Sequence, residues 1–293
     1  METSKKKLCV LIHFSNGSFI PYYVQIFANE LALFFDEVIL IGNKREVFVM
    51  PENLNSKITI LFEKNEGYDF GMFYKALQTV NLSEYNQIAC VNDSNILFNK
   101  LDTIFNWGNA TNFDFWGLID SYQKPKISIH TENYHIQSHF MVFNQKAILN
   151  LINYLKNPIV KSILNERDLK KCRNAVINFW EIGLTQYFIK NDLSVGSFID
   201  SVAFSKTYLG GKKTNISIKL YRELIKDNGY PLIKKKVITR SFLPFSLGLS
   251  NHWKNIIKKY GNQQWNIEKL LNELVNINIQ ALKSKFFVKK VGK

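Results

Sequence analysis

Two patterns of apolar residues alternate along the first 143 positions. One is a short unbroken apolar run, and the other is a spacing of three and four residues. Short apolar runs bounded by polar and turn-forming residues are typical of buried strands. They cover residues 7–14, 37–41, 57–62, 87–91, 113–118 and 137–143. Apolar residues three and four positions apart, typical of a helix face, mark 20–34 and 69–80, and such patterns resume from residue 145. Strands that alternate with helices over short links predict an α/β fold with a central, mostly parallel sheet.

From about residue 179 the pattern is mostly helical. Four helices are predicted, at residues 179–190, 216–227, 251–260 and 265–286. Residues 1–211 hold 20 basic and 20 acidic residues, whereas residues 212–293 hold 18 basic and 4 acidic ones. The whole formal net charge of +14 therefore lies in the last part of the chain. We predict an α/β domain at 1–211 and a basic, mostly helical region at 212–293 that packs on it.

The composition excludes several classes of protein. With 46% apolar and 21% charged residues, the chain is neither disordered nor collagen-like. Cys9, Cys90 and Cys172 are far apart and in no CxxC pair, which disfavours a disulfide framework and fits a reducing cytoplasm. No apolar run approaches the roughly 18 residues of a membrane-spanning helix. The positive charge favours phosphate groups, an anionic membrane face or nucleic acid as partner, although a solvated basic tail has the same composition.

Two polar segments follow predicted strands, where open α/β sheets bind ligands. Asn92 and Asp93 come directly after the fourth strand, and a carboxylate there is well placed for a divalent cation bound to a diphosphate. The alternative is ordinary turn chemistry. After the third strand, Gly67 and Gly71 flank Asp69 and would let a backbone approach a ligand closely. The alternative is a helix start with Asp69 as N-cap. Neither a dinucleotide fingerprint nor a P-loop is present.

Other candidates carry weaker signals. His135 and His139 are four residues apart, but their segment reads as a strand, so a zinc site is disfavoured, and no HExxH or GxSxG motif occurs. Glu181 lies near a predicted helix start on the same face as Leu184 and Phe188. A partly buried carboxylate aimed into a cleft could act as a general base, whereas an exposed one would be an ordinary first-turn glutamate.

Six segments together resemble the rhamnan synthesis protein F family, whose members are glycosyltransferases that build rhamnose-containing cell-surface polysaccharides. They occur in the family's order and span roughly residues 8–240. The segments are Asn65-Glu66-Gly67-Tyr68-Asp69-Phe70-Gly71, Val91-Asn92-Asp93-Ser94, Asp114-Phe115-Trp116-Gly117, the run 135–144, Trp180-Glu181-Ile182-Gly183-Leu184-Thr185, and 220–235. The resemblance implies a GT-A-like fold that binds a nucleotide sugar, with the basic helical C-terminal region as an extension.

The resemblance also assigns roles around the donor. Asn92 and Asp93 fall where such folds carry an Asp-x-Asp motif, but only Asp93 is acidic, so a Mg²⁺ or Mn²⁺ ion would rest on that one carboxylate. Lys234 and Lys235 could supply the remaining positive charge to the diphosphate. The other donor-binding residues implied are Asn65, Gly67, Asp69 and Gly71.

For an inverting transfer the resemblance implies Glu181 as the base that takes the acceptor proton, with Asp120 in reserve. The implied acceptor-binding residues are Trp116, His135, Gln137 and His139. The implied donor is dTDP-L-rhamnose or another dTDP-deoxyhexose, with a UDP- or GDP-sugar as the alternative. The acceptor would be a hydroxyl of a growing O-antigen of lipopolysaccharide, a capsule or a cell-wall glycan.

The family's acceptors are lipid-linked, which implies a cytoplasmic protein held peripherally on the anionic inner membrane of a bacterium. The rival from another class is a basic binding module without catalysis, for nucleic acid or an anionic surface. Against it, residues 1–211 are neutral and no nucleic-acid-binding motif occurs, so no nucleic-acid partner is expected.

Overall fold

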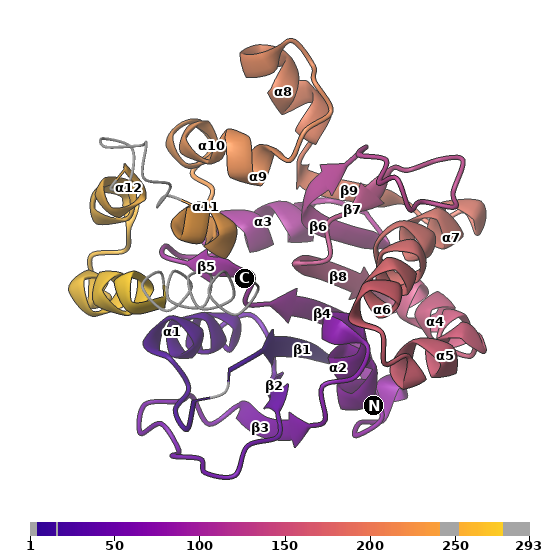
Figure 1. Cartoon of the computed structure of the whole chain (residues 1–293), viewed down its shortest axis with the longest axis horizontal. Helices are drawn as coiled ribbons and strands as arrows, with labels where there is room; N and C mark the ends of the chain where they lie inside the picture. The colour runs from indigo at the N-terminus through magenta and orange to yellow at the C-terminus, as the bar shows by residue number, and fades with distance from the viewer. Residues whose placement is uncertain (1–4, 16, 241–251, 278–293) are drawn as a thin grey trace, which may run out of the picture. The chain divides into compact units, whose positions relative to one another are not determined.

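The computed structural model of the chain describes residues 5–15, 17–240 and 252–277. The chain forms two compact units, and Figure 1 labels their helices and strands. Among the described residues, the first unit comprises 5–15, 17–20, 28–93 and 102–215, and the second comprises 21–27, 94–101, 216–240 and 252–277. Besides the C-terminal part, the second unit thus takes in two short segments that the charge pattern does not single out.

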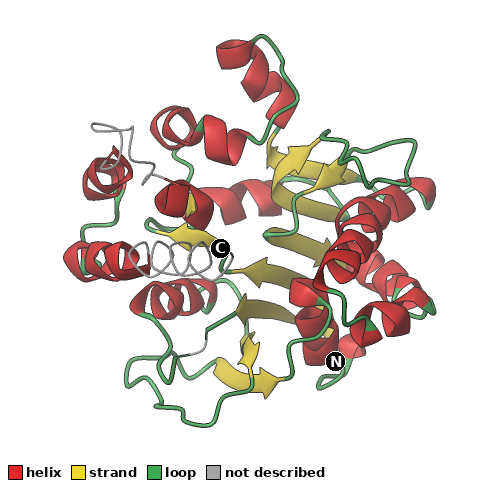
Figure 2. Cartoon of the chain, viewed as in Figure 1, coloured by secondary structure: helices red, strands yellow, loops and turns green. Residues whose placement is uncertain are grey.

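One eight-stranded sheet forms the centre of the first unit (Figure 2). Its strands run in the order β3-β2-β1-β4-β8-β6-β7, and β9 pairs with β6. The pairs β3–β2, β2–β1, β1–β4 and β6–β9 are parallel, whereas β8 and β7 pair antiparallel to their neighbours. The strands are β1 (Lys6–His13), β2 (Glu37–Asn43), β3 (Ile58–Glu63), β4 (Tyr85–Asn92), β6 (Phe115–Ser121), β7 (His135–Ile136), β8 (Phe140–Asn144) and β9 (Val195–Ile199). The predicted α/β class with a mostly parallel sheet is confirmed.

Helices cover both faces of this sheet, which is why its central strands read as unbroken apolar runs. On one face, α2 (Tyr68–Leu77), α4 (Gln145–Tyr154) and α7 (Leu184–Lys190) pack over the even-numbered side chains of β1. On the other face, α3 (Asp102–Ala110) contributes Phe105, whose ring contacts those of Trp116 and Phe140. The remaining elements are a 3-10 helix Leu82–Glu84, α5 (Ile159–Asn165), α6 (Leu169–Val176), a π-helix Ile177–Gly183 and α8 (Ser201–Leu209).

Several predicted boundaries are wrong. The helix predicted from residue 179 begins at Leu169 and runs without a break to Lys190, so Glu181 lies inside a helix and not near its start. The strand predicted at 137–143 begins at Phe140. Gly67, with φ of 74°, is the N-cap of α2, and Asp69 sits in its first turn. The strand β9 follows this helix in a part of the chain that the pattern predicts as helical.

In the second unit a short antiparallel pair joins β5 (Asn95–Leu97) to β10 (Leu232–Lys234). The predicted helix at 216–227 is two helices, and the one expected at 251–260 is confirmed. The helices of this part are α9 (Ile216–Lys219), α10 (Tyr221–Asn228), α11 (Lys235–Arg240), α12 (His252–Tyr260) and residues 267–277. The rest of the helix predicted at 265–286 lies outside the described residues. The helix α1 (Tyr22–Leu31) begins in this unit, where Glu273 accepts hydrogen bonds from the amides of Tyr22 and Tyr23.

Candidate functional site

A buried histidine–aspartate pair stands at the carboxyl ends of two adjacent parallel strands. His13 ends β1, and Asp93 directly follows β4. The His13 Nδ1 donates a hydrogen bond of 2.6 Å to Asp93 Oδ2, and these side chains are 2% and 9% exposed. The Asp93 amide donates to the Ile12 carbonyl at 3.1 Å. A buried carboxylate needs such a partner, because burial without one is strongly unfavourable. Asp93 is therefore held in one orientation at the sheet edge.

Asn92 connects three of the predicted segments. Its Nδ2 donates to Asp69 Oδ2 at 2.8 Å and to the Ser138 carbonyl at 3.2 Å. Its amide donates to the His139 carbonyl at 3.1 Å. Asp69 comes from the first turn of α2, and Ser138 from the link between β7 and β8. The amide side chain thus fixes α2 and this link relative to the end of β4.

Glu181 belongs to the same cluster. The Ser138 hydroxyl donates to Glu181 Oε1 at 2.5 Å, while the Ser138 carbonyl accepts from Asn92. Glu181 lies in the π-helix, and its half-buried side chain reaches the sheet edge through Ser138. The structure therefore brings the predicted base, Asn92, Asp69 and Asp93 together at one edge. The site contains two residues that sequence reasoning did not select.

Those residues are His13 and Ser138. A polar residue at the end of the apolar run 8–12 was a usable signal for His13, since strand ends carry ligand sites. Nothing in the pattern of residues 135–144 distinguishes Ser138, because its role depends on two contacts from distant segments.

Gly67, at the end of the loop after β3, and Gly71, in the first turn of α2, are both required by the local backbone geometry. Gly67 and Tyr68 both adopt positive φ, 74° and 53°. A Cβ on Gly71 would lie 1.7 Å from the Glu66 carbonyl oxygen. The close approach that the spacing predicts is thus an approach of the chain to itself. A role of Gly67, Gly71 and Asn65 in donor binding stays a prediction.

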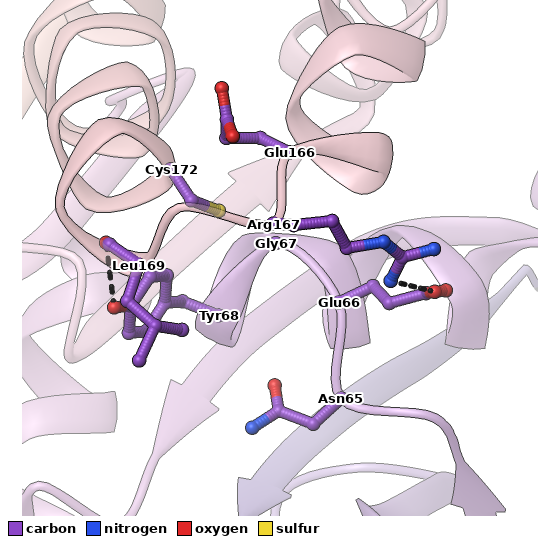
Figure 3. Close-up of a pocket in the computed structure, with 8 residues that line it drawn as sticks. All are labelled: Asn65, Glu66, Gly67, Tyr68, Glu166, Arg167, Leu169 and Cys172. Atoms are coloured by element: carbon purple, nitrogen blue, oxygen red, sulfur yellow. Dashed lines mark hydrogen bonds and ion pairs between the residues drawn. The ribbon is translucent and has the colours of Figure 1, made fainter.

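A pocket opens beside this loop (Figure 3). It is lined by Asn65, Glu66, Gly67, Tyr68, Glu166, Arg167, Leu169 and Cys172. The Glu66 carboxylate pairs with Lys64 at 2.8 Å, Lys75 at 3.0 Å and Arg167 at 3.2 Å. Hydrogen bonds from Lys64 and Lys75 lower the pKa of Glu66 to about 2. The Tyr68 hydroxyl donates to the Leu169 carbonyl at 2.9 Å, which fastens the loop to α6.

Asp120, the reserve base, supports the start of α8. Its Oδ1 accepts the Ser201 amide at 2.8 Å, next to the N-cap Asp200. Burial raises the pKa of the Asp120 carboxyl, and the hydrogen bonds from Ser201 oppose that shift. Gln137 lies alongside, with its Nε2 donating to the Asp120 carbonyl at 3.3 Å. This hydrogen bond at the start of α8 is a sufficient structural reason for a buried carboxylate at position 120, with no catalytic role required.

The other predicted acceptor residues are buried. Trp116 is 1% exposed and packs among the rings of Trp107 and Phe140. His135 is 6% exposed and donates from Nδ1 to the Asn133 carbonyl at 2.7 Å, and His139 is 4% exposed. Ring packing accounts for the burial of Trp116, and a local hydrogen bond accounts for that of His135. Acceptor binding by these residues stays a prediction.

Lys234 and Lys235 belong to the second unit. Lys234 faces Asn95 in the β5–β10 pair, and Lys235 Nζ lies 4.8 Å from the centre of the Tyr23 ring. Their contact with a diphosphate stays a prediction.

Within residues 5–15, 17–240 and 252–277, no group of three or more His, Cys, Asp or Glu side chains gathers as a metal site. Asp93 supplies one carboxylate, and Mg²⁺ is commonly bound by one or two carboxylates together with substrate phosphates. The donor set fits such a shared site. Among the helices that the structure describes, none is long and apolar enough to cross a membrane.

Proteins with an open α/β sheet bind their ligands at the carboxyl ends of the strands. This domain belongs to that class and carries a cluster of polar side chains there. Within this class, the chain belongs to the rhamnan synthesis protein F family, whose model matches residues 38–291. This membership supports a glycosyltransferase-type enzyme of polysaccharide synthesis.

Other comparisons are more distant. Virulence protein VirA of Vibrio anguillarum is 26% identical over 230 residues, which cover 69% of each chain. The 4-diphosphocytidyl-2C-methyl-D-erythritol synthase of Anaerococcus prevotii has 10% identity and a TM-score of 0.39, over 72% of this chain and 92% of its own. A protein assigned as a glucose-1-phosphate thymidylyltransferase of Bacillus anthracis has 8% identity and a TM-score of 0.40, over 71% and 96%. Structural similarity at this level carries no functional information.

Proposed function

We propose that this chain transfers a sugar from a nucleoside diphosphate to a hydroxyl of a growing cell-surface polysaccharide, with inversion at the anomeric carbon. The donor sugar is L-rhamnose or another deoxyhexose carried on dTDP, and the domain has a GT-A-like arrangement. Membership of the rhamnan synthesis family supports the sugar and the product class. The observation that carries the proposal is the chain of hydrogen bonds from Asn92 through Ser138 to Glu181, beside the buried Asp93.

In the proposed reaction Glu181 and Ser138 act on the acceptor. The acceptor oxygen attacks the anomeric carbon, and the bond from that carbon to the diphosphate oxygen breaks. The acceptor proton passes to the Glu181 carboxylate, which the Ser138 hydroxyl orients. The nucleoside diphosphate leaves with the bonding electron pair.

Charge on the leaving group must be balanced. Asp93 and Asn92 stand at the strand end, where they would hold the diphosphate through a shared Mg²⁺ or Mn²⁺ ion, which would neutralise part of its charge when bound. His13 keeps Asp93 in place by occupying Oδ2. Lys234 and Lys235 are the proposed protein cations.

Thermal unfolding with dTDP, dTDP-L-rhamnose, UDP and GDP, with and without Mg²⁺ or Mn²⁺, tests the proposal. A ligand at 100 times its dissociation constant adds about 2.7 kcal/mol to stability. We expect dTDP species to stabilise the protein, Asp93→Asn to weaken that effect, and Glu181→Gln to keep it while losing transfer. Glu132→Gln, on an exposed side chain, is the matched control.

Other outcomes would change the proposed donor or refute the proposal. Stabilisation by UDP or GDP alone would keep the chemistry and change the donor. If no nucleotide stabilised the protein and nucleic acid clearly did, the enzyme proposal would be refuted in favour of a basic binding module.

The proposed place of action is the cytoplasmic face of the inner membrane, where a lipid-linked acceptor would lie. Its support is the concentration of basic residues in 212–293. Replacing Lys283, Lys285, Lys289 and Lys290 by Gln should weaken binding to anionic phospholipid vesicles. Unchanged binding would contradict this location.

A further inference from the structure

The long helix Leu169–Lys190 contains a π-helical segment at Ile177–Gly183, and Glu181 lies in it. A π-helix is rare, and it occurs mostly as a single turn inside an α-helix, frequently at functional sites. Where a π turn meets an α-helix the ladder of backbone hydrogen bonds changes its spacing, and side chains from outside the helix that bond to carbonyls of the turn help to hold it. The structure supplies such side chains.

Tyr154, at the end of α4, provides one of them. Its hydroxyl donates to the Phe179 carbonyl at 2.6 Å, and its ring stacks on Phe179 with centres 4.4 Å apart. Burial raises the pKa of the Tyr154 phenol, so the hydroxyl remains a hydrogen-bond donor at neutral pH.

Gly183 makes room for this contact. A Cβ at this position would lie 2.8 Å from the Tyr154 hydroxyl and 2.5 Å from the Asn178 carbonyl oxygen. The second distance arises because the π turn brings residue 178 over residue 183. A side chain at Gly183 would therefore oppose both the π turn and the hydroxyl that supports it.

Two further contacts fasten the same turn. His130 Nε2 donates to the Asn178 carbonyl at 2.7 Å, and within the helix itself the Thr185 hydroxyl donates to the Glu181 carbonyl at 3.3 Å. The Asn178 side chain in turn donates to the Ile127 carbonyl at 2.9 Å. Side chains from outside the helix thus hold the π turn at two carbonyls, those of Asn178 and Phe179.

We propose that Tyr154 and Gly183 are positioning residues for Glu181, acting by holding the π-helical turn. A helix advances on the order of 100° per residue, so relaxation of the turn to α-helix would rotate the Glu181 carboxylate away from Ser138. This inference rests on the proposed role of Glu181 as the base.

The first test is structural and needs no substrate. Tyr154→Phe removes only the hydroxyl, and the control is Tyr187→Phe, whose ring lies 4.8 Å from that of Tyr154. We expect amide hydrogen exchange at residues 177–183 to rise at least about tenfold in Tyr154→Phe and in Gly183→Ala, and to stay unchanged in Tyr187→Phe. Unchanged exchange in both of the first two variants would overturn the inference.

The second test measures turnover of dTDP-L-rhamnose as release of dTDP. Tyr154→Phe should lower kcat about 10- to 100-fold with little change in the donor KM, because misplacement of a reacting group acts on the chemical step. Combined with Glu181→Gln, it should cause no further loss. A full additional loss in the double variant would show that Tyr154 acts independently of Glu181 and would overturn the inference.

The two failures are distinguishable. If Glu181→Gln keeps wild-type kcat, the proposed base is wrong. If Glu181→Gln is inactive while Tyr154→Phe keeps wild-type kcat, only the positioning role is wrong.

Discussion

The buried pair of His13 and Asp93 should show a large coupling energy in a double-mutant cycle. The variants are His13→Phe, which keeps a ring of similar shape without its nitrogens, Asp93→Asn, and their combination. With the side chains 2% and 9% exposed, water has little access to replace the lost partner. A buried group left without its hydrogen-bond partner typically costs about 1–3 kcal/mol.

The expected coupling follows from the 2.6 Å contact between Nδ1 and Oδ2. A hydrogen bond to a charged group contributes about 1.5–3 kcal/mol. We therefore expect each single variant to be less stable than the wild type, and the double variant to be more stable than the sum of the two losses predicts, by about 1.5–3 kcal/mol.

Urea unfolding at pH 7, followed by circular dichroism, measures these free energies if the slope with urea stays the same in all four proteins. Independent sites add within about 0.3–0.5 kcal/mol. A coupling inside that range would refute the reasoning that His13 holds Asp93 in its orientation at the strand end.

Three further predictions concern residues around the site. Glu66→Gln should lower the free energy of unfolding at pH 7 by about 1–2 kcal/mol, since it breaks three partly exposed ion pairs. Because the folded pKa of Glu66 is lowered to about 2, this difference from the wild type should shrink as the pH falls below about 4.3, and a difference independent of pH in urea unfolding would contradict the prediction. Gly71→Ala should destabilise by about 3 kcal/mol or more, because a Cβ 1.7 Å from a backbone oxygen cannot be relieved by side-chain movement, and a melting temperature equal to wild type would refute this. Burial raises the folded pKa of Asp120, so the cost of burying its charged carboxylate grows as the pH rises through that pKa. The stability of Asp120→Asn relative to the wild type should therefore be higher at pH 7 than at pH 4. The reverse order in thermal unfolding would refute this pH dependence.

The main elements were predictable from residues near one another in the sequence. A strand buried on both faces needs an apolar run, and a helix with one buried face needs apolar residues three and four apart. These local requirements located β1 to β4 and α2 within a few residues. The position of Asn92 and Asp93 at a strand end was also readable, because strand ends of an open α/β sheet carry ligand sites.

Local pattern failed where a distant partner decides the structure. The short β9 and β10 gain their strand conformation from β6 and β5. The π turn at Glu181 depends on Tyr154 and on an absent Cβ at Gly183, neither of which alters the helical period of the sequence.

The sequence by itself determined the α/β class, the order of most elements and the edge at which the candidate site lies. Tertiary structure alone decided which side chains meet there. It joined Ser138 to Glu181 and His13 to Asp93, and it buried Trp116 in the core. The physical reason is that secondary structure follows from burial of one face of each segment, whereas a hydrogen bond between residues 80 positions apart depends on the register of the whole sheet.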